Sequence, residues 1–120
     1  MRKLIFLGLS LAPLFAFAKF VSPLAFEGSY AQKEEVIQFI KSNVHKIYCE
    51  DAPDACGDST LRVMEKYELV SFKQATEATD KKIMQQVIDT YCKGKSEMCS
   101  YSTVVMMYRQ NLKASPQKLE

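Results

Sequence analysis

The sequence predicts an all-α protein in which four short helices form two disulfide-linked αα-hairpins, after a cleaved signal peptide. Three observations support this prediction. Apolar residues recur at the three-to-four-residue spacing of amphipathic helices in four segments, and no segment shows the alternation typical of a strand. All four cysteines lie in two stretches of the same form, YCEDAPDAC at residues 48–56 and YCKGKSEMC at residues 91–99. The chain begins with the features of an export signal.

The export signal has the three parts of a secretory signal peptide. Arg2 and Lys3 give a charged start, residues 4–17 are mostly apolar, and AFA at residues 16–18 is a small-residue cleavage site. The apolar run is shorter than the roughly 20 residues of a membrane-spanning helix, and no stop-transfer segment follows. We therefore expect cleavage to remove residues 1–18 and to release a periplasmic or secreted protein.

The charge balance excludes several classes of partner. The formal net charge of +2 is due to Arg2 and Lys3, so cleavage leaves a domain without net charge. A neutral domain lacks the basic surface that binds nucleic acid or an anionic membrane. We expect no nucleic-acid partner and no stable membrane insertion after cleavage.

The remaining chain divides into an arm, one helical domain and a short tail. Residues 19–28 are apolar and interrupted by Pro23, which predicts an extended N-terminal arm. Helical periodicity covers residues 29–114, and the tail at residues 115–120 is expected to be frayed.

The first helix is expected over residues 29–48. Ser29 and Gln32 have the spacing of a capping box at its start. Phe39 falls off the apolar stripe. The residues that share one face at the 3.6-residue period are Val36, Ile40, Val44, Ile47 and Tyr48.

The second helix is expected over residues 60–72, with Asp58 or Ser59 as its cap. The polar segment KQATEAT at residues 73–79 is interpreted as the connection to the next helix. The apolar residues expected on the inner face are Val63, Met64, Tyr67 and Val70.

The third and fourth helices show the same kind of stripe. The third ends at about Cys92, and its inner face is expected to carry Ile83, Met84, Val87, Ile88 and Tyr91. The fourth is expected over residues 100–113, with Tyr101, Val104, Val105, Tyr108 and Leu112 turned inward.

The two cysteine stretches indicate an internal duplication. When Tyr48 is aligned with Tyr91, Cys49 meets Cys92 and Cys56 meets Cys99, with apolar positions matching on both sides. Chance alignment of two amphipathic hairpins is the alternative. Four cysteines in an exported chain allow three pairings, and the symmetry favours Cys49–Cys56 with Cys92–Cys99.

The sequence lacks the motifs of common catalytic and metal sites. The six-residue gaps between cysteines miss zinc-site spacing, and no Cys-x-x-Cys redox motif occurs. His45, the one histidine, is interpreted as a helix residue, and the acidic turn around Asp51 and Asp54 as solvated rather than as a calcium site. We expect no enzyme activity, cofactor or metal.

The fourth helix supplies the candidate binding residues. It is apolar around much of its circumference, and Met106 lies about 200° from Val104 at 100° per residue. Met106 and Arg109 are therefore expected to contact a protein partner. The expected function is non-enzymatic protein binding, as an immunity protein, an inhibitor or a small accessory of a secretion or envelope complex. A periplasmic holdase chaperone is the alternative, and a small enzyme is the third class considered.

Overall fold

The structure is a computed structural model that describes residues 19–94 and 97–116. The expected signal peptide at residues 1–18 and the end of the expected tail, residues 117–120, lie outside this part. Every regular element in the described ranges is helical, which confirms the predicted all-α fold. The four α-helices are α1 (Tyr30–His45), α2 (Asp58–Thr76), α3 (Lys81–Cys92) and α4 (Tyr101–Ala114).

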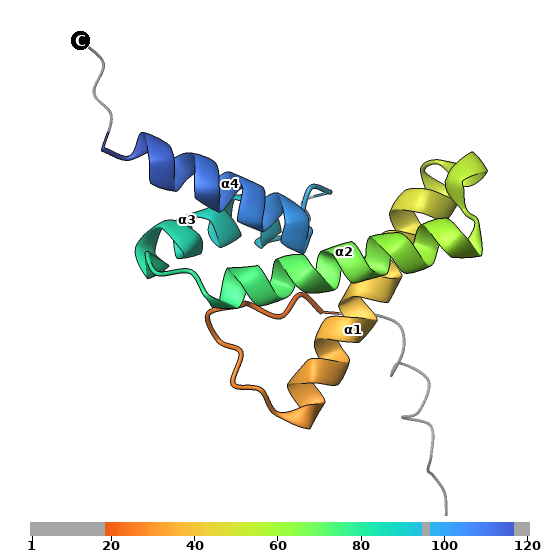
Figure 1. Ribbon diagram of the computed structural model, residues 1–120, viewed down its shortest axis with the longest axis horizontal. Coiled ribbons are helices and arrows are strands. Elements are labelled where there is room, and N and C mark those ends of the chain that lie inside the picture. The colour runs from red at the N-terminus through yellow and green to blue at the C-terminus, as the bar shows by residue number, and fades with distance from the viewer. Residues whose placement is uncertain (1–18, 95–96, 117–120) are drawn as a thin grey trace, which may run out of the picture.

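The long helix α2 is central to the arrangement. It contacts α1 on one side and α4 on another, and α3 packs against α4 (Figure 1). In this view α1 crosses α2, and the orange N-terminal arm runs beneath α2 before it turns into α1. Because α2 contacts both α1 and α4, it connects the two hairpins of the domain.

Both disulfides lie within a hairpin, as predicted. Cys49 pairs with Cys56 and Cys92 with Cys99, with Cα–Cα distances of 4.6 and 4.7 Å. Cys49 lies in a π-helical turn, η2 (Lys46–Glu50), and the loop that the first bond closes contains a 3-10 turn, η3 (Pro53–Ala55). The second cysteine of each pair directly precedes the N-cap residue of the next helix. This equivalence is compatible with a duplicated hairpin, and the duplication itself stays a prediction.

Side-chain caps define the starts of three helices. Ser29, Asp80 and Ser100 each accept a hydrogen bond from the backbone N–H three residues later, at 3.0–3.1 Å. The expected capping box at the first helix is only half formed, because the Gln32 side chain bonds to the arm. It accepts from the N–H of Glu27 at 2.7 Å instead of reaching back to Ser29. This bond ties the arm to the first turn of α1.

The second helix differs from its predicted limits. It begins at Asp58 with Gly57 as its N-cap and no side-chain cap bond, although Asp58 or Ser59 was the expected cap. It continues to Thr76, so the first half of the expected connection, residues 73–76, is the last helical turn. Burial of Ala75 explains this extension, because helical geometry places that small residue against the core.

The core has two adjoining apolar clusters. One lies between α3, α4 and the end of α2, and it includes the predicted inner residues Ile83, Met84, Val87, Ile88, Val104, Val105 and Tyr108. The other joins α1 to Phe72 and Tyr101, and the arm residue Phe20 packs against both clusters. Two expectations fail here. Leu112, which was expected to face inward, is 39% exposed on the last turn of α4. Phe39, expected off the stripe, packs into the second cluster.

Tyr101 is the centre of the second cluster and is fully buried. Its ring stacks on Phe20 at 5.1 Å and meets Phe39 and Phe72 edge-on at 5.5 and 4.8 Å. Its hydroxyl donates to the carbonyl of Val21 at 2.9 Å and accepts from the N–H of Val21 at 3.1 Å. One side chain thus fixes the arm, α1 and α2 to the start of α4.

Candidate functional site

Most of the α2 residues that were predicted to face the core are exposed to solvent. Val63, Tyr67 and Val70 are 60%, 54% and 51% exposed, whereas Glu68 is only 6% exposed. The side chains of α2 that are buried are Glu68, Ser71, Phe72 and Ala75. The predicted inner face was therefore wrong for three of its four residues, and Met64, half-buried against the second cluster, is the exception.

Glu68 explains why the polar side of α2 is buried. Its Oε1 accepts hydrogen bonds from the backbone N–H groups of Tyr101 at 2.8 Å and Ser102 at 3.2 Å. These N–H groups belong to the first turn of α4, where no helical carbonyl is within reach and the helix dipole favours an anion. A carboxylate is satisfied there, so α2 turns Glu68 inward and leaves Val63, Tyr67 and Val70 in solvent.

Met106 lies on the same surface as the exposed residues of α2. It is 50% exposed and lines a hollow of about 420 Å³ between α2 and α4. Arg109 also lines this hollow, and its Nη2 donates to the Gln74 side-chain oxygen at 3.2 Å. The side chains that line the hollow are Tyr67, Val70, Ser71, Gln74, Ser102, Met106, Arg109 and Gln110.

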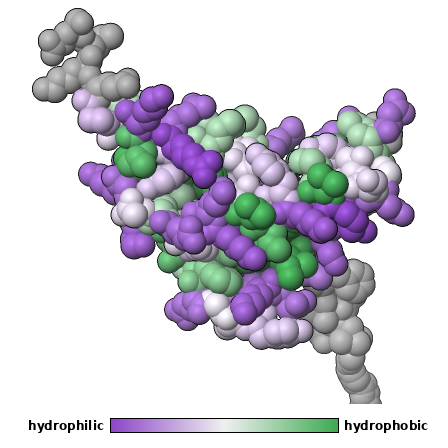
Figure 2. Space-filling view, viewed as in Figure 1, coloured by the Kyte–Doolittle hydropathy of each residue, from purple (hydrophilic) through white to green (hydrophobic). Residues whose placement is uncertain are grey.

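We call this surface the α2–α4 face and define it as Val63, Tyr67, Val70, Met106 and Arg109. The structure brings the two residues expected to bind a partner, Met106 and Arg109, next to two residues that were expected in the core. Figure 2 shows apolar side chains interrupting the charged surface over the middle of the molecule, where α2 runs in Figure 1. The sequence does carry a signal for this exposure: α2 has more apolar residues than one inward-facing stripe can hold, so some of them must face solvent.

The α2–α4 face has one fixed charge in its hollow. Arg109 carries the one charged side chain among the lining residues, and the other lining groups are apolar, hydroxyl or amide. The backbone beneath is held by the bonds from α4 to Glu68. The hollow therefore offers a preformed apolar recess beside a single planar donor of hydrogen bonds.

A hydrogen bond between the hairpins also joins α1 to the second disulfide. The Asn43 side chain of α1 donates to the carbonyl of Cys99 at 3.1 Å, next to the second disulfide. The end of α1 is thereby joined to Cys99, the residue before the N-cap of α4. The scaffold under the α2–α4 face is held by this bond, by Glu68 and by Tyr101.

The other titratable groups of the described residues include exposed pairs on the first hairpin. His45 lies 3.7 Å from Glu50 with both side chains exposed, and Lys46 pairs with Asp51 at 3.8 Å. Across residues 19–94 and 97–116, no group of three or more histidine, cysteine, aspartate or glutamate side chains is placed to hold a metal ion. All four cysteines are paired, so none is available as a nucleophile.

Two further findings concern the described helices and the similarity of the chain to known proteins. Among the described helices, none combines the length and the apolar character that crossing a bilayer requires. No family model, curated protein or solved structure matches the chain. The geometry of the α2–α4 face is therefore the basis for a functional assignment.

Proposed function

We propose that this protein is an exported, non-enzymatic protein-binding domain whose binding surface is the α2–α4 face. The observation that carries this proposal is the exposure of Tyr67, Val70 and Met106, each at half or more, around one hollow, with the exposed Val63 one turn before Tyr67 on α2. Apolar residues gathered on one surface mark interaction sites, while isolated ones are ordinary. Tyrosine, methionine and arginine are also enriched at protein interfaces.

The chemistry of the hollow defines the expected partner. An apolar side chain of the partner would enter between Tyr67 and Met106, where the flexible methionine adapts to its shape. A carboxylate beside that side chain would pair with Arg109, in place of its present bond to Gln74. We therefore expect a partner that presents an apolar side chain next to an aspartate or glutamate.

The cellular setting is part of the same proposal. Two disulfides suit an oxidising compartment, and together with the expected signal peptide they favour a periplasmic or secreted protein. In that setting a small rigid binder is suited to the role of an immunity protein, an inhibitor or an accessory subunit of a secretion or envelope complex.

A holdase chaperone is the second candidate function. The same exposed apolar side chains favour it, because holdases bind unfolded clients through such surfaces. The two functions differ in stoichiometry and breadth: an inhibitor or accessory subunit binds one native partner, and a holdase suppresses the aggregation of many unrelated clients. A small enzyme has less support, since no nucleophile and base are brought together in the described residues.

Capture from a cell-envelope extract, followed by titration with the purified captured protein, tests the proposal. Val70→Asp places a charge on the α2–α4 face and should weaken binding by about tenfold or more, as expected for a central interface residue. Gln86→Asp is the matched control, because Gln86 is exposed on α3, away from this face. Equal binding by both variants would contradict the proposal, and aggregation suppression for many clients would favour the holdase.

A further inference from the structure

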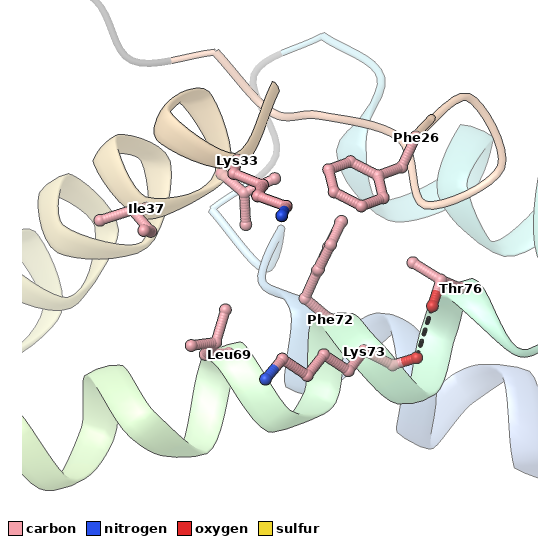
Figure 3. A pocket seen from close by; sticks show the side chains of 8 residues that line it. Phe26, Lys33, Ile37, Leu69, Phe72, Lys73 and Thr76 are labelled. Atoms are coloured by element: carbon pink, nitrogen blue, oxygen red, sulfur yellow. Dashed lines mark hydrogen bonds between the residues drawn. The ribbon is translucent and has the colours of Figure 1, made fainter. Parts of the chain in front are cut away.

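A second concave surface lies on the other side of α2, where it crosses α1. It is a pocket of about 330 Å³, and its apolar lining comes from the arm, α1 and α2 (Figure 3). Val36 and Phe72 at its floor are core residues, and the ring of Phe26 meets that of Phe72 edge-on at 4.9 Å. The full lining is Phe26, Lys33, Val36, Ile37, Leu69, Phe72, Lys73 and Thr76.

Two lysines are the charged groups of this pocket. Lys33 reaches toward the opening from α1, and Lys73 lies along α2 on the opposite side (Figure 3). Both side chains are exposed, and no ion pair with either is found within the described ranges. Each ammonium group is therefore free to bind an anion at the mouth.

The basic character continues beyond the pocket. A neighbouring hollow of about 220 Å³ shares Ile37 and Leu69 with it and adds Lys41 and Lys66. Its one acid, Glu65, is already engaged by Arg62 at 2.7 Å. Lys33 and Lys73 of the pocket and Lys41 and Lys66 of the neighbouring hollow thus gather four ammonium groups along α1 and α2, although the domain from residue 19 onward has no net charge.

The lining has almost no polar groups for a ligand other than the lysines. The hydroxyl of Thr76 already donates to the carbonyl of Lys73 at 2.6 Å. An extended peptide in the pocket would leave its own N–H and carbonyl groups without partners, which costs free energy at each group.

We propose that this pocket binds the carboxylate of a single-chain fatty acid, with the acyl chain against Phe26, Ile37 and Leu69 and the headgroup between Lys33 and Lys73. A ligand that is polar at one end only matches a lining that is polar at its mouth only. The volume lies at the low end for small-molecule sites, which suits one acyl chain rather than the two of a phospholipid. This site is separate from the α2–α4 face and does not depend on the proposed protein partner.

Isothermal titration with laurate, below its micelle concentration, tests this proposal on the full mature chain. One laurate should bind per molecule. Methyl laurate has the same chain and no charge, and its affinity should be lower by about tenfold or more. Lauroyl-lysophosphatidylcholine distinguishes a lipid headgroup from a free carboxylate, and it should also bind more weakly than laurate. Equal affinity for all three, or uptake of many laurates per molecule, would overturn the proposal.

Two paired variants assign the headgroup contact. Lys33→Gln with Lys73→Gln should reduce laurate affinity about tenfold and leave methyl laurate unchanged, because only the charge contact is removed. Lys82→Gln with Lys113→Gln is the matched control, with the same charge change at exposed positions of α3 and α4. Both pairs are surface changes and should fold normally, as a thermal melt will show. Equal laurate affinity of the two pairs would overturn the assignment.

Discussion

The carboxylate of Glu68 on α2 accepts a hydrogen bond from the backbone N–H of Tyr101, the first residue of α4, at 2.8 Å. A helix in the first hairpin thus caps a helix in the second. This contact sets which side of α2 is buried, and with it the exposure of Val63, Tyr67 and Val70. The α2–α4 face is a consequence of this one polar interaction together with the packing around Tyr101.

Replacing Glu68 should show how much its cap on α4 contributes to the free energy of unfolding. Glu68→Ala leaves the N–H groups of Tyr101 and Ser102 without their acceptor, and should lower the free energy of unfolding by about 2–3 kcal/mol in a urea titration. Glu68→Gln keeps an acceptor oxygen and should lose less. Glu77→Ala, at an exposed position just after α2, is the control and should change stability little. Full stability of Glu68→Ala would show that the cap is not required.

The two disulfides should behave as independent local crosslinks. Cys49→Ser is expected to free the thiol of Cys56 alone and to leave Cys92–Cys99 intact in unreduced peptide maps. Because each bond closes a short loop, its loss should cost about 2.5 kcal/mol by loop entropy. A peptide joining a cysteine of the first hairpin to one of the second would reject this pairing.

Stability should fall at alkaline pH because of Tyr101. Burial raises the pKa of the Tyr101 phenol above its usual value of about 10, against the opposing effect of its hydrogen bond to Val21. Below pH 10 the phenol is protonated in both states. Above pH 10 the Tyr101 phenol ionises in the unfolded chain but stays protonated in the folded one. The free energy of unfolding therefore falls by up to about 1.4 kcal/mol per pH unit.

Tyr101→Phe checks this account in urea titrations at pH 8 to 11. The variant should be less stable at pH 8, because Val21 loses its hydrogen-bond partner, and should show a smaller decline toward pH 11. Tyr30→Phe removes a hydroxyl from a side chain that is 77% exposed and should keep the decline of the unmodified protein. An identical pH dependence in Tyr101→Phe would contradict the role of this tyrosine.

The elements that the sequence predicted well are those with one apolar stripe and one neighbour. α3 packs mainly on α4, and its stripe of Ile83, Met84, Val87 and Ile88 is buried as expected. The cysteine symmetry likewise led to the observed disulfides. In both cases the determining contacts are local in the sequence.

The face of α2 could not be predicted in the same way. A helix with neighbours on two sides has no single apolar stripe, and the bond from Glu68 to α4 joins residues 33 apart in the sequence. Hydrophobic periodicity places a glutamate outside unless its distant partner is known. The prediction for Met106 depended only on its own helix, and its exposure agrees with the expected direction.

Met106→Asp, measured for both thermal stability and partner affinity, tests the central claim that the α2–α4 face binds a protein. The melting temperature should stay nearly unchanged, because Met106 is half exposed, whereas Val104→Asp, a core control, should unfold the domain by burying a charge. Affinity for the partner captured from the cell envelope should fall about tenfold or more. A folded Met106→Asp protein that binds this partner with undiminished affinity would contradict the claim.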